Sequence, residues 1–230
     1  MSKYDISRVK RSKEKAKITY DKLSKWYDLF SGKTENKYRD AGLKKLAAMK
    51  GDTVLEIGFG TGRCILALAE SVGSFGMVYG IDISKGMCQI TRNRVQRAGL
   101  SDRVVLECAD ALNLPFADGF FDAIFMSFTL ELFDTPEIPL LLDECTRVLN
   151  KVGRICIVAL SKEGNHKNVK SFYEWLHRCF PNSFDCRPIY VKRSIENAGF
   201  RVLSQDIMYM WGLSVEIVLA EKQSIYTTEP

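Results

Sequence analysis

Histidine is scarce in this 230-residue chain, and paired cysteines are missing. It has two histidines, His166 and His177, and none of its seven cysteines belongs to a Cys-x-x-Cys pair. Structural zinc sites are built from clustered Cys and His ligands, and disulfide scaffolds from an even, regularly spaced set of cysteines. The sequence therefore predicts no metal site and reduced cysteines.

Long apolar runs are also missing. No run approaches the roughly 20 residues that cross a bilayer, and the basic N-terminal stretch leads into no apolar signal-peptide core. We therefore expect a cytoplasmic protein. With 46% hydrophobic residues, a chain of this length can bury one sizeable core, so we expect a single main domain.

An excess of positive charge is present only at one end of the chain. Residues 1–25 carry nine Lys or Arg against three acidic residues, so the net charge of +5 leaves the remainder at −1. A nearly neutral body argues against a nucleic-acid partner. The basic arm, residues 1–17, is either a solvated terminus or a segment weakly attracted to an anionic membrane surface or substrate.

From residue 53 onward, apolar strands alternate with amphipathic helices. Strands are predicted at 53–57, 77–81, 103–108, 121–127 and 154–160, and helices at 63–70, 85–97 and 136–149. Such alternation favours a parallel sheet with right-handed crossovers. The final strands, 201–208 and 213–220, follow a helix at 191–198 and are joined too closely for a parallel crossover. We expect a Rossmann-like, doubly wound α/β fold with seven strands, one of them antiparallel near the C-terminus, and helices on both faces.

The domain is expected to span residues 18–222, between the basic arm and a tail at 223–230. Its first part, 18–50, should form an N-terminal helical lid, with a helix at 35–49 that ends near Gly51. Residues 18–30 place apolar side chains on one helical face, which is typical either of packing on the core or of closure over a ligand. Residues 161–190 are rich in aromatics and broken by two prolines, so we expect a substrate-binding insertion there.

The chemistry centres on the turn that follows the first predicted strand. Gly58, Gly60 and Gly62 alternate, which permits a sharp bend and the close approach of a ligand. The third glycine of dinucleotide-binding turns comes one position later, where this chain has Arg63. Glu56 precedes the turn and would repel a phosphate while attracting an ammonium group. The turn therefore favours a cationic or zwitterionic ligand over NAD.

Acidic residues also follow the next two strands. Asp82 can accept hydrogen bonds from both hydroxyls of a ribose, although a loop aspartate or a helix cap near Ser84 is the alternative. Asp110 can bind the exocyclic amine of adenine, while the N–H of Ala111 serves a ring nitrogen. Together with Glu56, these residues indicate an adenosine with a charged tail that lacks phosphate.

Four segments resemble successive motifs of the class I S-adenosylmethionine-dependent methyltransferases. They are VLEIGFGTG, GIDISKGM, ADALNLPF and FDAIF, within a resemblance that spans roughly residues 20–220. The segments YDKLSKWYD and DISKGM are most similar to the C-methyltransferases of ubiquinone and menaquinone biosynthesis, and small phospholipid N-methyltransferases share them. The resemblance implies S-adenosylmethionine as cofactor and S-adenosylhomocysteine as product.

The resemblance also assigns cofactor-binding roles along the chain. Glu56 and the glycine turn (Gly58, Gly60, Gly62) would hold the methionine part, and Asp82 would hold the ribose. Ile83 and Met87 would cover the adenine face, and Asp110 with Ala111 its edge. Ser127 would face the sulfonium, and Tyr20 or Tyr27 would close over the methionine carboxylate.

The acceptor is expected to be a small or lipidic molecule, with an aromatic quinone-type carbon as the first choice. Three segments form either an apolar pocket or ordinary core: the helix with Trp26 and Tyr27, residues 127–133, and the aromatic-rich residues 172–190. Holding the acceptor nucleophile near the methyl group of the cofactor can supply much of the catalysis. No catalytic base is assigned, because His166 and His177 fit loop or packing positions. The alternatives are phospholipid or small-molecule N-methylation and a non-catalytic cofactor-binding regulator.

Overall fold

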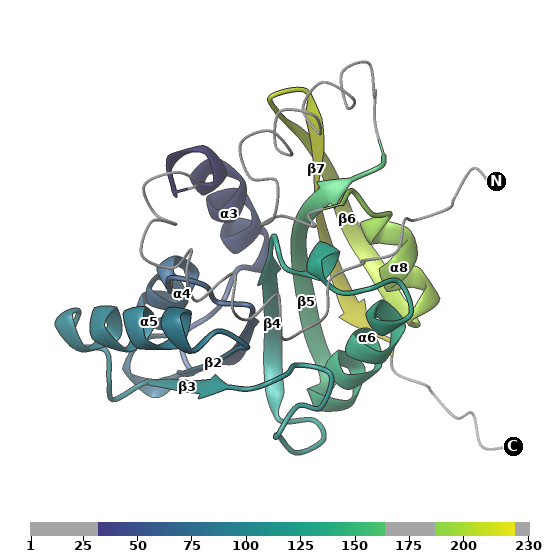
Figure 1. Cartoon of the computed structure of the whole chain (residues 1–230). Helices are drawn as coiled ribbons and strands as arrows, with labels where there is room; N and C mark the ends of the chain where they lie inside the picture. Colours follow the sequence, from purple (N-terminus) through teal and green to yellow (C-terminus); the bar gives the residue numbers. More distant parts are fainter. Residues whose placement is uncertain (1–31, 164–186, 224–230) are drawn as a thin grey trace, which may run out of the picture.

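The computed structural model describes residues 32–163 and 187–223 of the chain, and Figure 1 shows their arrangement. The basic arm, residues 18–31 of the expected lid and most of the expected insertion at 161–190 lie outside these residues. The same holds for all but the first residue of the tail at 223–230. The division of the chain into those segments therefore remains a prediction.

Seven strands form one sheet in the order β3-β2-β1-β4-β5-β7-β6. Their bounds are β1 Thr53–Ile57, β2 Met77–Asp82, β3 Val104–Cys108, β4 Phe121–Ser127, β5 Leu149–Ser161, β6 Phe200–Met210 and β7 Leu213–Lys222. The pairs among β1 to β5 are parallel, whereas β7 is antiparallel to both β5 and β6. The predicted fold class, with a single antiparallel strand near the C-terminus, is confirmed.

Helices cover both faces of the sheet (Figure 1). The described helices are α3 Gly32–Leu46, α4 Arg63–Val72, α5 Lys85–Arg97, α6 Glu137–Val148 and α8 Val191–Asn197, with short 3-10 turns η1 Gly73–Phe75 and η2 Leu130–Leu132. Along β5, Ile155 and Ile157 pack with α6 and α8, whereas Cys156 and Val158 pack on the side of α3 and α4. From Ile155 to Leu160 the strand is apolar because both of its faces are buried there.

The order of the strands indicates where in the sheet a ligand would bind. β1 pairs with β2 on one side and with β4 on the other, so the chain winds outward in both directions from the β1–β4 boundary. In open parallel sheets, ligands bind outside the carboxyl ends of the strands at such a switch point. The ends of β1 and β4 are Ile57 and Ser127, next to the glycine turn.

Several predicted boundaries were wrong by a few residues, and three of them have a visible cause or consequence. α3 ends at Leu46 rather than Met49, because left-handed Ala47 (φ 50°) interrupts it before Gly51. α6 begins at Glu137 rather than at residue 136, and its first turn has no side-chain cap. β5 begins at Leu149 rather than Arg154, since Leu149 pairs with Phe121 ahead of a bulge.

The described cysteines are unpaired thiols, and most of them are core residues. Cys64, Cys145 and Cys156 are buried, and burial raises the pKa of each of these thiols. They therefore stay neutral and pack as small apolar groups. Within residues 32–163 and 187–223, no helix combines the length and the apolar character needed to span a bilayer.

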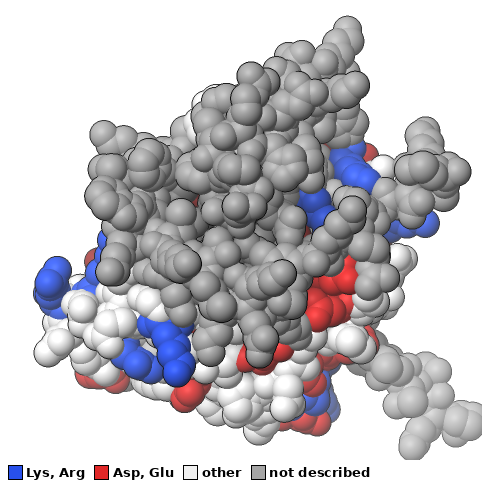
Figure 2. Space-filling view, viewed as in Figure 1, with Lys and Arg blue, Asp and Glu red and all other residues white. Residues whose placement is uncertain are grey.

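Figure 2 shows the described charged side chains on one face of the molecule. Lys and Arg side chains are seen on the side of α5 and also at the upper right, and several Asp and Glu side chains gather on the side of α6. α5 itself carries Lys85, Arg92, Arg94 and Arg97. Both signs of charge are therefore present on the described part of this face.

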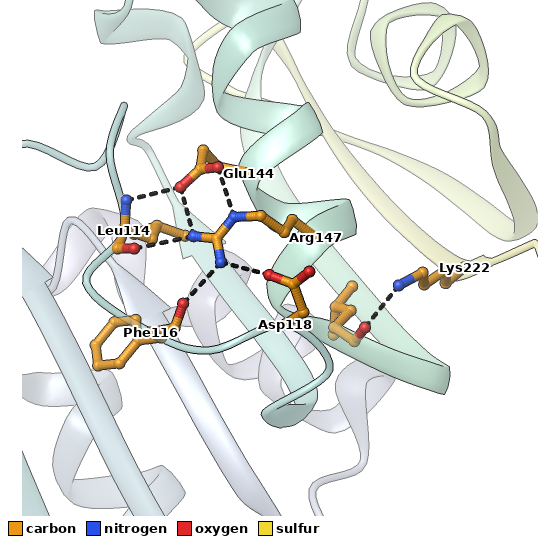
Figure 3. Close-up of polar contacts among 7 residues, drawn as sticks. Leu114, Phe116, Asp118, Glu144, Arg147 and Lys222 are labelled. Atoms are coloured by element: carbon orange, nitrogen blue, oxygen red, sulfur yellow. Dashed lines mark hydrogen bonds and ion pairs between the residues drawn. The ribbon is translucent and has the colours of Figure 1, made fainter.

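Arg147 on α6 fixes the long connection between β3 and β4 (Figure 3). Its guanidinium donates to the carbonyl oxygens of Leu114 (2.9 Å) and Phe116 (2.7 Å) and to the carboxylates of Asp118 (2.9 Å) and Glu144 (2.8 Å). Glu144 also accepts from the Leu114 amide at 2.8 Å. These bonds lower the pKa of Glu144 and hold the segment that follows Asp110 against the helix.

We expect Arg147→Met to lower the free energy of unfolding by about 2 kcal/mol, because several charge-assisted hydrogen bonds are lost together. Urea denaturation followed by circular dichroism measures this loss. The matched control is Arg103→Met, since Arg103 pairs with the exposed Asp102 next to it and should contribute less than about 0.5 kcal/mol. Equal losses in the two variants would contradict a clamping role for Arg147.

Candidate functional site

The glycine turn has the left-handed backbone that its sequence predicts. Gly58, Gly60 and Gly62 have φ angles of 73°, 53° and 83°. A Cβ at Gly58 would lie 2.4 Å from the side chain of Thr129, and one at Gly62 would lie 2.4 Å from Thr91. A Cβ at Gly60 would meet nothing within 4 Å. Gly58 and Gly62 thus permit close packing, whereas Gly60 faces open space.

The amides of the turn donate inside the protein. Gly58 N–H donates to the Ile81 carbonyl (2.8 Å), Gly60 N–H to the Asp82 carboxylate (2.9 Å) and Gly62 N–H to the Phe59 carbonyl (2.9 Å). The Gly60 carbonyl accepts from the Thr91 hydroxyl at 2.9 Å. In this structure the three glycine N–H groups are therefore already used within the protein.

Asp82 at the end of β2 ties two elements together. One carboxylate oxygen accepts from Gly60 N–H and the other from Ser84 N–H, both at 2.9 Å. A helix cap was the alternative role for Asp82. In the structure the cap of α5 is Ser84, whose hydroxyl accepts from the Met87 amide at 3.2 Å. Asp82 thus holds the turn in place and lies at the sheet edge where a ribose role is predicted.

Glu56 is a buried carboxylate directly before the turn. It is 2% exposed, and its Oε2 has no hydrogen-bond partner among the described residues. Burial raises the pKa of Glu56 well above its usual range, while the positive charge of Arg39 on α3 lowers it and the negative charge of Asp82 raises it further. A buried carboxylate oxygen without a partner is costly to the fold, and a cationic ligand would relieve that cost.

The other predicted cofactor residues lie at the neighbouring strand ends. Asp110 follows β3, and its carboxylate accepts from Leu112 N–H at 3.1 Å, while Ala111 is 7% exposed. Ile83 follows β2, and Met87 lies buried in the first turn of α5. Since β2 pairs with β3 up to Asp82 and Cys108, these residues share one edge of the sheet with Glu56.

Ser127 ends β4 beside β1, as predicted. It is 8% exposed, and its hydroxyl oxygen has no hydrogen-bond partner in the described part of the chain. The next residue, Phe128, is held at φ 52° while its amide donates to the Val158 carbonyl at 2.7 Å. A left-handed aromatic residue is strained, and such strain concentrates at functional sites.

The roles of Glu131, Arg39 and Glu35 were not foreseen. Glu131, in the predicted pocket segment 127–133, is fully buried, and one of its oxygens accepts from Leu160 N–H at 3.2 Å. Arg39 pairs with Glu35 within α3, and its charge acts on Glu56. The sequence signal for Glu131 was an acidic residue inside an apolar run, which also fits ordinary core.

Four residues considered at the sequence level fall outside the described residues. They are Tyr20 and Tyr27, predicted to close over the cofactor, and His166 and His177, considered as bases. Their roles remain predictions. Within residues 32–163 and 187–223, no cluster of three or more His, Cys, Asp or Glu residues could hold a metal ion.

Comparisons with known proteins agree with this geometry. Residues 54–153 match a methyltransferase domain model. A demethylmenaquinone methyltransferase of Symbiobacterium thermophilum is 32% identical over 197 residues, covering 79% of this chain and 77% of that protein. The demethylmenaquinone methyltransferase of Lactobacillus johnsonii is 32% identical over 163 residues, which cover 71% of this chain but only 64% of that relative. The crystal structure of the [4+2]-cyclase SpnF has the same fold, with a TM-score of 0.76, 18% identity and coverage of 94% of this chain and 99% of that one.

The chain belongs to the class I S-adenosylmethionine-dependent methyltransferases. Within that family its sequence lies close to the quinone methyltransferase group. The family cofactor is S-adenosylmethionine, as the motifs imply.

Burial raises the pKa of Glu131 to about 8 from an ordinary value of 4.5, so its carboxyl is protonated in the folded chain at neutral pH. A raised folded-state pKa stabilises the protein fully below about pH 4.5, and this contribution is lost as the pH rises toward 8. We therefore expect the wild type to lose about 1.4 kcal/mol per pH unit relative to Glu131→Gln across this range. Urea denaturation from pH 5 to 9 measures the difference, and a difference independent of pH would contradict the raised pKa.

Proposed function

We propose that this protein binds S-adenosylmethionine at the glycine turn and transfers its methyl group to a small or lipidic acceptor. The observation that carries the proposal is the buried Glu56 oxygen, which has no partner among the described residues, beside a turn that opens at Gly60. An ammonium group satisfies this oxygen, whereas a phosphate would be repelled. The carboxylates at the ends of β1, β2 and β3 therefore fit a zwitterionic adenosine, whose ammonium, hydroxyl and amine groups donate hydrogen bonds.

Each residue has a distinct role in this proposal. Glu56 would bind the ammonium of the methionine part, and Asp82 would accept from the ribose hydroxyls. Asp110 would accept from the adenine amine, between Met87 and Ala111. Ser127 would border the place where the acceptor meets the methyl group.

Catalysis would come mainly from position. S-adenosylmethionine, when bound, supplies a methyl group on a positively charged sulfur. The chain would hold the acceptor atom in line with that group, about 3 Å away, and exclude water. The strained Phe128 and the buried Ser127 and Thr129 provide a fixed wall for this purpose.

The acceptor we propose is a reduced quinone-type ring methylated on carbon. Support comes from the names of the relatives, since the Symbiobacterium and Lactobacillus proteins are demethylmenaquinone methyltransferases. A phospholipid or a small amine is the alternative acceptor. The positive charges of residues 1–17 motivate a further proposal, weak contact with an anionic membrane that holds such an acceptor.

We expect Gly60→Ala to lower the affinity for S-adenosylmethionine at least tenfold, because its Cβ would occupy the open space beside the turn. Gly51→Ala is the matched control, since Gly51 is also left-handed (φ 90°) and also open but lies at the other end of β1. Both variants should lose about 1–2 kcal/mol of stability. Calorimetry with the two folded variants separates the effects, and equal affinities would show that the ligand lies elsewhere.

A panel of acceptors tests the chemistry. We expect radiolabelled methyl transfer to a demethylated naphthoquinol in detergent or vesicles, and little transfer to phosphatidylethanolamine or small amines. Transfer only to an amine would replace the quinone proposal with N-methylation. Cofactor binding without transfer to any acceptor would favour a non-catalytic role or another chemistry, since the fold also serves the [4+2]-cyclase SpnF.

A further inference from the structure

Glu131 lies over the carboxyl ends of β4 and β5, within η2. Its Oε1 accepts from the amide of Leu160, near the end of β5. The preceding Thr129 donates to the carbonyl oxygens of Ser127 (3.0 Å) and Gly58 (3.4 Å), so this segment packs directly on the glycine turn. Glu131 is therefore fixed on the β4–β5 side of the switch point, whereas Glu56, Asp82 and Asp110 occupy the β1–β3 side.

The described part of the chain does not explain why the second oxygen of Glu131 is present. Oε2 is buried without a hydrogen-bond partner among the described residues, although the side chain is fully enclosed. Leaving a buried carboxyl oxygen unsatisfied costs about 1–3 kcal/mol. A purely structural bond to Leu160 N–H needs only one acceptor oxygen, which glutamine supplies equally well.

Two charged groups from other parts of the fold act on the pKa of Glu131. The negative charge of Glu35, on α3, raises its pKa, whereas the positive charge of Arg187 lowers it. Arg187 is itself buried and donates to the Phe133 carbonyl at 2.6 Å, just beyond η2. Glu35 pairs with Arg39, which also acts on Glu56, so the groups on the two sides of the switch point are electrostatically linked.

We propose that the second oxygen of Glu131 binds the hydroxyl of an aromatic acceptor and takes its proton as the methyl group is transferred. This inference rests on the proposed function and defines the acceptor class as an aromatic ring whose hydroxyl activates a neighbouring carbon. The reacting carbon lies over β4 and β5, and the cofactor lies over β1 to β3.

The proton and electron balance is complete without an added reagent. Glu131 accepts the hydroxyl proton while the ring electrons form the new carbon–carbon bond and the sulfur–carbon bond breaks toward sulfur. Loss of the proton from the methylated carbon restores the aromatic ring, and a proton returns to the hydroxyl oxygen. The sum is one methylated ring, one S-adenosylhomocysteine and one proton released.

The environment of Glu131 suits this task. Its pKa of about 8 is nearer to that of a phenol, about 10, than an ordinary carboxyl would be. A base works best when its pKa lies near the working pH, and a positioned base contributes roughly 10²- to 10⁴-fold in rate.

The test is Glu131→Gln, which keeps an acceptor for Leu160 N–H, beside Glu70→Gln as a matched control on the exposed face of α4. With a demethylated naphthoquinol, we expect Glu131→Gln to lower kcat at least 100-fold and to abolish the rise of kcat with an apparent pKa near 8. S-adenosylmethionine affinity should stay within twofold of the wild type in both variants. Unchanged kcat and an unchanged pH profile would overturn the proposal.

Infrared spectroscopy supplies a readout that does not need turnover. The protonated carboxyl band that disappears in Glu131→Gln should titrate near pH 8 and shift when 1,4-naphthalenediol is added under anaerobic conditions. If the band shifts with the diol but no methyl transfer is detected, Glu131 contacts the acceptor and the proposed methyltransferase function is contradicted. If methyl transfer is detected but the band does not shift with the diol, only the proposed role of Glu131 is contradicted.

Discussion

The carboxyl end of β1 imposes the constraint on which the site depends. The chain leaves a fully buried strand through three left-handed glycines, and Thr129 and Thr91 pack where two of their side chains would be. Asp82 then fastens the turn to β2 by accepting from Gly60 N–H and Ser84 N–H. Because the turn, the end of β2 and the segment after β4 contact one another, none can move without the others. The side of the candidate site that β1 and β2 form is held together for that reason.

The candidate site also contains two buried acidic side chains whose hydrogen bonding is incomplete in the described structure. Glu56 and Glu131 are both enclosed, and each has one oxygen without a partner among the described residues. Burial raises the pKa of both groups, and the charge of Arg39 offsets only part of the effect at Glu56. Stability is lost at such positions, and ligand binding is the usual reason that a fold retains them. The two glutamates flank the β1–β4 boundary, where two reactants would meet.

The sequence predicted the parts of this arrangement that local rules determine. The predicted bounds of α5, 85–97, agree with the structure, in which Ser84 caps the helix, and the turn followed from its alternating glycines. Boundaries set by tertiary contacts were less predictable. Leu149 joins β5 because it pairs with Phe121, and α3 stops at Leu46, where Arg154 donates to the carbonyl oxygens of Leu46 and Ala47. Neither contact has a signature within its own segment.

Glu131 illustrates the same limit at the level of function. In sequence it is one acidic residue between Leu130 and Leu132, and its neighbours fit either a pocket wall or plain core. Only the pairing of β4 with β5 brings Leu160 N–H to one of its oxygens and leaves the other without a partner in the described structure. The motif residues report which cofactor the family uses. In our proposal the choice of acceptor depends on Glu131, whose surroundings are created by tertiary contacts and are therefore visible only in the three-dimensional structure.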